Sequence, residues 1–176
     1  MMEVNYKKLD DRAVAPRYGS EYAAGLDLSA LIQNGARAQR IPAGATVKIS
    51  TGIAMEIPEG YFGAIFARSG MATKRGLRPA NCVGVIDSDY RGEIIVALHN
   101  DTEKCETIHS GDRIAQMVIM PYLGVQLNEV EELNSTERGS GGFGSTGVSS
   151  EVSGKDAEDN NIEGQMSIYD VCPDLI

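Results

Sequence analysis

The chain has 176 residues, of which 42% are hydrophobic, and a formal net charge of −9. This length is typical of one domain and is sufficient to bury a substantial core. The sequence has no basic stripe, which argues against sustained binding to duplex nucleic acid. It also has no apolar run near the roughly 18 residues that a membrane-spanning helix requires.

The cysteines and the N-terminal residues point to a reducing compartment. Cys82, Cys105 and Cys172 are widely scattered and form neither a disulfide framework nor a Cys-x-x-Cys zinc pair. His99 and His109 lack the spacing of metal ligands, so we interpret them as structural or surface residues. The first eight residues contain no apolar segment that could serve as a signal peptide. We therefore expect a cytoplasmic protein.

Short runs rich in β-branched residues recur along the chain, with turn sequences between them. Pro-Ala-Gly at 42–44, Pro-Glu-Gly at 58–60 and Ser-Gly-Asp at 110–112 are such turns. This spacing is typical of an all-β, antiparallel sandwich or barrel. A single short helix fits within 71–75, and no longer window has a helical period. Examples of the runs that we predict to be strands are 46–49, 61–66, 93–98 and 113–119.

The composition changes near residue 133, where we expect the β core (1–133) to end. Residues 134–147 are rich in glycine and small polar residues. Residues 148–176 contain seven acidic residues and only Lys155 as a basic one, so we predict a disordered acidic tail. The last dozen residues of that tail become apolar again.

Two segments contain residues suited to nucleotide chemistry. Arg68, Ser69 and Gly70 follow an apolar run, and they combine a guanidinium fork, a hydroxyl and an accessible backbone, which suits phosphate oxygens. The alternative is a tight turn with a surface arginine. Asp87 lies beside a turn, and Tyr90 follows three residues later. A carboxylate in such a place can act as a general base, and a nearby aromatic ring can pack on a ligand. The alternatives are an ordinary acidic hairpin turn and a metal held by the Asp87 and Asp89 pair, although two carboxylates alone are weak support for a metal site.

Two further segments are less specific. Residues 111–116 form a turn before an apolar strand, in which Gln116 is the polar exception. Residues 138–147 are glycine-rich but include Arg138 and Phe143, so this loop could wrap a phosphate and stack on a base. It lacks the lysine of a Walker motif. The alternative is a flexible linker.

Taken in order, these segments resemble the motifs of the trimeric dUTPase family. Each segment alone is a weak pattern, but the complete, ordered set is specific. The resemblance implies an antiparallel, jelly-roll-like β-barrel that forms a homotrimer with an active site at each subunit interface. The matching segments are 24–28, 68–70, 84–92, 111–116 and 138–145.

The resemblance also implies an activity, the hydrolysis of dUTP to dUMP and pyrophosphate, which lowers dUTP and supplies dUMP for dTMP synthesis. Asp87 would be the general base that activates water toward the α-phosphorus, and Tyr90 would pack on the deoxyribose and exclude a 2′-hydroxyl. Mg²⁺ would be held mainly by the substrate phosphates, with Asp27 nearby through water or in a structural role. The other implied substrate contacts are Asn81, Val85, Ile86 and Ile95 at uracil, Arg68, Ser69, Gly70 and Gln116 at the phosphates, and Arg138, Phe143, Gly144, Ser145 and Thr146 in a closing lid.

The end of the tail has a resemblance of its own. Gln165, Met166, Ser167, Ile168 and Tyr169 are similar to the short peptide with which bacterial proteins dock on the polymerase sliding clamp. The alternative is an apolar tail that packs on its own trimer or stays loose. Two other functions remain open for the whole chain, namely dCTP deamination on the same fold and nucleotide-responsive binding of a protein partner.

Overall fold

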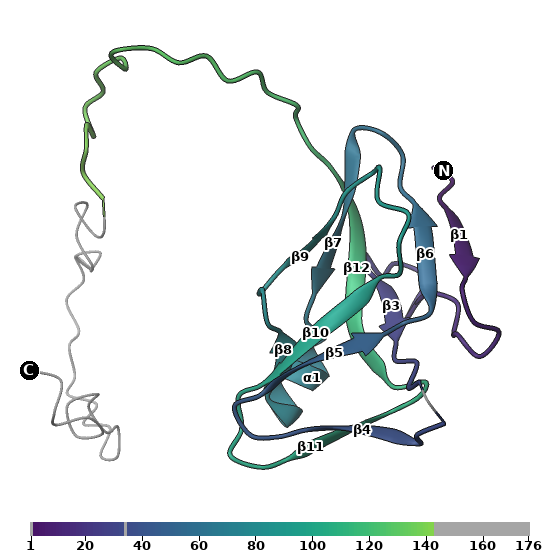
Figure 1. Ribbon diagram of the computed structural model, residues 1–176. Helices are drawn as coiled ribbons and strands as arrows, with labels where there is room; N and C mark the ends of the chain where they lie inside the picture. The colour runs from purple at the N-terminus through teal and green to yellow at the C-terminus, as the bar shows by residue number, and fades with distance from the viewer. Residues whose placement is uncertain (1, 34, 143–176) are drawn as a thin grey trace, which may run out of the picture. The chain divides into compact units, whose positions relative to one another are not determined.

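Figure 1 shows the computed structural model, which describes residues 2–33 and 35–142. Within these ranges the chain forms antiparallel strands and one short helix, which confirms the predicted all-β class. The elements in chain order are β1 (Asn5–Lys8), β2 (Arg17–Tyr18), β3 (Leu26–Ser29), β4 (Ala38–Ile41), β5 (Thr46–Ser50), β6 (Ile53–Glu56), β7 (Tyr61–Phe66), α1 (Ser69–Arg75), β8 (Leu77–Pro79), β9 (Gly84–Ile86), β10 (Ile95–Asn100), β11 (Glu106–His109) and β12 (Arg113–Pro121).

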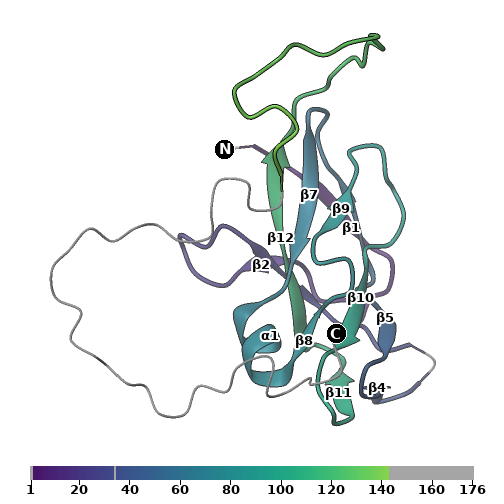
Figure 2. The ribbon, with the colours of Figure 1, turned by 90° about the vertical axis from the view of Figure 1, so that its left-hand side faces the viewer.

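The largest sheet has the strand order β2-β3-β12-β7-β9. Its central strand β12 pairs with β3 on one side and β7 on the other, and Ile114, Ala115 and Met117 are fully buried. β12 and β7 run side by side in both ribbon views (Figures 1 and 2). A register shift between Arg113 and Ala115 places Gln116 opposite Asp27 of β3. Gln116 is therefore a polar residue fixed at the centre of this sheet.

Three smaller sheets complete the core, with orders β5-β10-β8, β11-β4 and β1-β6. They pack around a cluster dominated by isoleucine, leucine and methionine, each of which stabilises the fold by about 1.5–3 kcal/mol when fully buried. Side chains with 0% exposure come from five different segments. The large apolar ones are Ile41, Leu77, Ile94, Leu98, Ile108, Ile114 and Met117.

The predicted strands at 46–49, 61–66 and 113–119 correspond to β5, β7 and β12, and the predicted helix lies within α1. The run at 93–98 becomes a strand two residues late, at Ile95. The reason is that Glu93 and Ile94 bond to the β5–β6 turn and the start of β6 instead. The Gly52 N–H donates to Glu93 Oε1 at 2.7 Å, and the Ile94 N–H donates to the Ile53 carbonyl at 2.8 Å.

The helix α1 ends where the chain adopts a left-handed conformation at Gly76, with φ of 59°. The N–H of this glycine donates back to the carbonyls of Met71 and Ala72, which closes the last turn. Arg75 anchors the helix to β11 through Glu106 at 2.8 Å. The N-terminal end of α1, at Arg68 and Ser69, is thereby held in place beside β7.

The compact β unit ends at Leu127. Residues 128–142 of the following unit contain neither helix nor strand. Before that boundary, Leu123, Val125 and Leu127 are 91%, 76% and 89% exposed, an alternation that leaves an apolar row in water. Among the residues that the structure describes, no helix has the length and apolar character needed to cross a membrane.

Candidate active site

A carboxylate held by two arginines forms the centre of the first candidate site. Asp27 on β3 is only 8% exposed. Its Oδ1 accepts a hydrogen bond from Arg68 Nε at 2.7 Å, and its Oδ2 accepts one from Arg113 Nη1 at 2.9 Å. Two guanidinium groups against one carboxylate leave a net positive charge at this point, which favours an anionic ligand.

These residues border a cavity of about 450 Å³ beside the start of α1. Gln116 lies in its wall, where its Nε2 donates to the Ala67 carbonyl at 3.0 Å. Gly25 closes against the same side chain, because a Cβ at this position would come within 3.0 Å of Gln116 Oε1. Ser69 and Gly70, the first two residues of α1, also line this cavity. The lining residues are Gly19, Ala23, Gly25, Asp27, Arg68, Ser69, Gly70, Arg113 and Gln116.

Sequence reasoning singled out Arg68, Ser69, Gly70, Gln116 and Asp27, and the structure brings these five together. It missed Arg113, which was treated as part of a structural turn. A signal was available, because Arg113 is a basic residue directly after a Ser-Gly-Asp turn at the start of an apolar strand. The pairing with Asp27 is not visible in the sequence, since 86 residues separate the partners.

The second candidate site lies at the turn that follows β9. A cavity of about 190 Å³ is lined by Val85, Ile86, Asp87, Tyr90, Glu93 and Ile95. The Tyr90 N–H donates to the Asp87 carbonyl at 3.2 Å, and the Tyr90 hydroxyl donates to the Glu93 carbonyl at 2.9 Å. A carboxylate and an aromatic ring therefore share one tight turn. Val85 and Ile95 are 59% and 44% exposed, so this cavity opens through apolar surface.

Asn81 lies on the loop between β8 and β9 and borders the start of β9. Its Nδ2 is 3.6 Å from the position of a Cβ at Gly84. The loop is tight: Val83 N–H donates to the Asn81 carbonyl at 2.6 Å, and Cys82 has a φ of 61°. The edge of β9 that does not pair with β7 is thus exposed, and the Asn81 amide lies next to it.

The two cavities lie toward opposite ends of β7 and share no lining residue. Ile86 pairs with Gly63, so Asp87 comes level with Phe62, whereas Arg68 follows the other end of the strand. Six residues separate position 62 from Arg68, so at about 3.3 Å per residue the Cα atoms of Asp87 and Arg68 in one chain are roughly 20 Å apart. In Figure 2, α1 accordingly lies below the β7–β9 pair. A single chain does not bring these two residues to one phosphate group.

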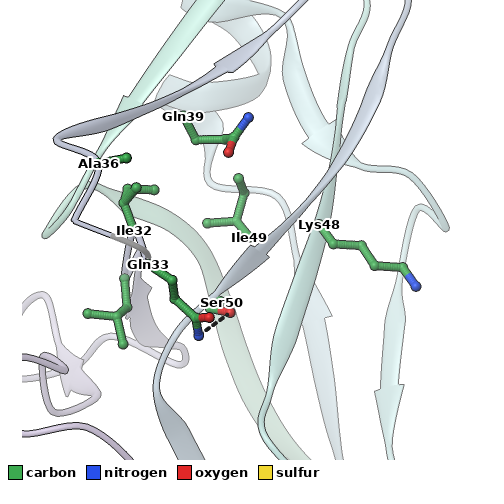
Figure 3. Close-up of a pocket in the computed structure, with 8 residues that line it drawn as sticks. Ile32, Gln33, Ala36, Gln39, Lys48, Ile49 and Ser50 are labelled. Atoms are coloured by element: carbon green, nitrogen blue, oxygen red, sulfur yellow. Dashed lines mark hydrogen bonds between the residues drawn. The ribbon is translucent and has the colours of Figure 1, made fainter.

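Besides a concavity of about 410 Å³ along β1 and β6, two more lie in the β unit. One of about 590 Å³ adjoins the Asp87 turn and is lined by Ile57, Glu59, Asp87, Ser88, Asp89, Arg91 and Tyr122. The other, of about 280 Å³, lies between β5 and the segment before β4 (Figure 3). In that pocket Gln33 Nε2 donates to Ser50 Oγ at 3.1 Å, and Lys48 extends away from the other side chains. None of the predicted site residues lines the pocket of Figure 3.

The predicted lid is described in part. Arg138 Nε donates to the Gly141 carbonyl at 2.9 Å within its own loop. Phe143, Gly144, Ser145 and Thr146 lie outside the described residues, as do the acidic tail and the segment 165–169. Among residues 2–33 and 35–142, no cluster of three or more His, Cys, Asp or Glu side chains is arranged to hold a metal ion.

A family model described as dUTPase matches residues 11–147. The chain belongs to the dUTPase family. A deoxyuridine 5′-triphosphate nucleotidohydrolase from Desulfitobacterium hafniense is 47% identical over 149 residues, which are 84% of this chain and 97% of that protein. The region that carries both cavities is thus the region that defines the family.

Solved structures of phage dUTPases are similar to this fold. The Staphylococcus bacteriophage 80alpha dUTPase with dUPNHPP superposes with a TM-score of 0.75 at 30% identity, covering 84% of this chain and 100% of that one. A mutant dUTPase from phage phi11 of S. aureus, whose structure reveals the coordination of a structural Mg(II) ion, has a TM-score of 0.67 at 25% identity and covers 76% of this chain and 100% of its own.

Proposed function

We propose that this member of the dUTPase family hydrolyses dUTP to dUMP and pyrophosphate, lowering dUTP and supplying dUMP for dTMP synthesis. The observation that carries the proposal is the convergence of Asp27, Arg68, Arg113 and Gln116 on one cavity, together with the Asp87–Tyr90 turn, within the span that matches the family. The first group suits a triphosphate, and the second suits a general base beside a sugar.

We further propose that the working enzyme is a homotrimer in which two chains complete each site. A general base must lie within hydrogen-bond reach of the attacking water, whereas Asp87 and Arg68 of one chain are roughly 20 Å apart. The Arg68 cavity of one chain facing the Asp87 cavity of the next would remove this separation. The exposed Val85 and Ile95 around Asp87 support burial of that surface against a neighbour.

In the proposed reaction, Asp87 accepts a proton from a water molecule whose oxygen attacks the α-phosphorus. The new P–O bond forms as the bond between the α-phosphorus and the oxygen bridging to the β-phosphate breaks. That oxygen leaves with pyrophosphate, and the proton rests first on the Asp87 carboxylate. Arg68 and Arg113 would neutralise charge on the phosphates, with Ser69, Gly70 and Gln116 fixing their orientation.

The described residues fit a Mg²⁺ ion that is carried by the substrate. Both carboxylate oxygens of Asp27 already accept hydrogen bonds from arginines, so this side chain suits an indirect role through water rather than direct ligation. Mg²⁺ keeps several waters and is commonly bound by one or two carboxylates plus substrate phosphates. When bound, it supplies further neutralisation of phosphate charge.

Uracil and deoxyribose would be recognised around β9. The Asn81 amide and the exposed backbone near Val85, Ile86 and Ile95 can pair with the uracil edge, so that cytosine would leave buried groups unpaired. The Tyr90 ring would form a close wall that leaves no room for a 2′-hydroxyl. Specificity would then depend on rejecting both the wrong base and the wrong sugar.

Pyrophosphate release from dUTP, measured beside dCTP, dTTP and UTP, tests this function. Turnover restricted to dUTP is the expected result. Ammonia release from dCTP would instead indicate a deaminase, and turnover of all four nucleotides would contradict the assignments of Asn81 and Tyr90. If no nucleotide is hydrolysed, binding of a non-hydrolysable dUTP analogue would test for a nucleotide-responsive binding protein.

We also propose a role for the segments after the core, which we divide at residues 133 and 147. Residues 134–147 would close over the nucleotide, with Phe143 stacking on uracil. Arg138, Gly144, Ser145 and Thr146 would then contact the triphosphate. Truncation after Ser140 tests this: pyrophosphate release should be lost while the β unit unfolds at an unchanged temperature. Retained turnover would contradict the lid.

The resemblance of residues 165–169 to a clamp-docking peptide supports a second, separate proposal. Gln165 would make polar contacts at the edge of a groove, and Ile168 and Tyr169 would fill an apolar pocket. The acidic segment before them would act as a tether. Calorimetry with a peptide spanning 160–176 and a bacterial sliding clamp is the test, with an Ile168→Ala peptide as control. Absence of heat from the unmodified peptide would contradict clamp docking.

A further inference from the structure

Two residues next to Tyr90 form a seat for its ring. Gly92 lies against the hydroxyl end of the ring, because a Cβ at this position would clash with the Tyr90 hydroxyl and come within 2.6 Å of Cζ and 2.9 Å of Cε2. The tyrosine hydroxyl donates to the Glu93 carbonyl at 2.9 Å. The hydroxyl end of the ring is therefore bounded by a residue without a side chain and is fixed by the Glu93 carbonyl.

Glu93 connects this seat to the core of the β unit. Its Oε1 accepts the Gly52 N–H at 2.7 Å, and the adjacent Ile94 N–H donates to the Ile53 carbonyl at 2.8 Å. Gly52 is itself constrained, with φ of 68° and with Leu31 Cδ2 only 2.6 Å from where a Cβ would lie. The Tyr90 ring is thus held in position by contacts that lead back to buried residues.

We propose that Gly92 and Glu93 are positioning residues that set the discrimination between deoxyribonucleotides and ribonucleotides by fixing Tyr90. This inference rests on the proposed function of Tyr90 as the wall against the 2′-hydroxyl. Steric rejection of one extra hydroxyl needs a wall that does not yield, since a loosely packed pocket accepts such a substituent at small cost. A ring moved off Gly92 changes the space at the 2′ position more than it changes the contacts of dUTP elsewhere.

Gly92→Ala is the direct test, measured as kcat/KM for dUTP and for UTP on the full-length chain. Gly92 does not have a positive φ, so the backbone accepts alanine and the tyrosine ring is what must move. We expect the dUTP/UTP ratio to fall about tenfold. Gly124→Ala is the matched control, because a Cβ there meets no atom within 4 Å. An unchanged ratio in Gly92→Ala would overturn the inference.

A double-substitution cycle separates positioning from general damage. In a Tyr90→Ala background the wall is already absent, so Gly92→Ala should leave the dUTP/UTP ratio where Tyr90→Ala placed it. A glycine needed only for folding would lower turnover of both nucleotides by one common factor in both backgrounds. That pattern would contradict the role of Gly92 in sugar discrimination.

For Glu93, the conservative variant provides the control. Glu93→Gln keeps an oxygen that can accept the Gly52 N–H and should retain the ratio, whereas Glu93→Ala should lower it. An unaltered ratio in Glu93→Ala would remove Glu93 from the proposal. The same comparisons made by calorimetry with non-hydrolysable dUTP and UTP analogues need no turnover. An inactive wild type that still prefers the deoxy analogue, and loses this preference in Gly92→Ala, would contradict the proposed catalysis but support the seat.

Discussion

Arg68 Nε donates to Asp27 Oδ1 at 2.7 Å, which joins the residue before α1 to a buried position on β3. Asp27 is nearly buried and Arg68 retains 26% of its side-chain exposure. The carboxylate therefore orients the guanidinium before any phosphate arrives, so that less ordering remains to be done on binding.

Replacing Asp27 by asparagine should weaken this preorganisation. Asparagine keeps one acceptor oxygen but presents an NH₂ group toward the other arginine, so one charge-assisted hydrogen bond is lost. We expect the free energy of unfolding to fall by about 1–2 kcal/mol and KM for dUTP to rise about tenfold. Urea unfolding and pyrophosphate release measure the two effects. Asp101→Asn, which breaks the exposed Arg78 pair, is the control and should alter neither greatly.

Replacing Asp87 by asparagine should remove the base and retain the binding site. The amide cannot accept the proton from water, and general-base contributions are typically about 10²–10⁴-fold. We expect kcat to fall in that range while calorimetry gives a similar affinity for a non-hydrolysable dUTP analogue. Asp89→Asn, two residues along the same exposed turn, is the control. Equal losses in both variants would contradict the assignment of Asp87.

Complementation tests whether two chains build one site. Asp87→Asn and Arg68→Ala should each be inactive alone, because every site lacks one half. When the two variants are refolded together, random mixing should restore about a quarter of the sites in a symmetric ring of shared interfaces. Pyrophosphate release per chain is the readout. If the mixture stays as inactive as its components, each site lies within one chain.

Asn100 should be critical for stability and not for chemistry. It has 0% exposure, and its Nδ2 donates to the carbonyls of Ile41 at 2.9 Å and Lys104 at 2.7 Å, while Oδ1 accepts the Thr102 N–H at 3.0 Å. Asn100→Ala leaves these buried groups unpaired, and we expect a loss of about 3 kcal/mol in the free energy of unfolding. A change below about 1 kcal/mol in chemical denaturation would contradict this role.

The sequence was sufficient to predict the central strands and the short helix, because their apolar runs face the core. It did not predict β1, in which all four residues are exposed and no alternation marks a buried face. Nor did it predict β4 and β11, which pair with each other through half-buried, largely polar residues. Pairing between such strands depends on residues that are far away in the sequence, so a local pattern does not reveal it.

The candidate site divides in the same way. Asp87 and Tyr90 were predicted together because a four-residue turn holds both. Arg113 escaped notice because its partner Asp27 lies on a strand far away in sequence, and only the register of β12 against β3 brings them together. The separation of Asp87 from Arg68 was likewise visible only once β9 was seen to run antiparallel to β7.

Because of that antiparallel arrangement, the length of β7 sets the distance between Arg68 and Asp87. Its residues 61–66 pair with β12 along their whole length and with β9 over part of it, so neither end can slide independently. Inserting one residue would turn every later side chain to the opposite face of the sheet. Inserting two would preserve the faces but move Arg68 away from Asp87 by about 7 Å. We therefore expect the number of residues in β7 to be fixed, even where its side chains can be substituted.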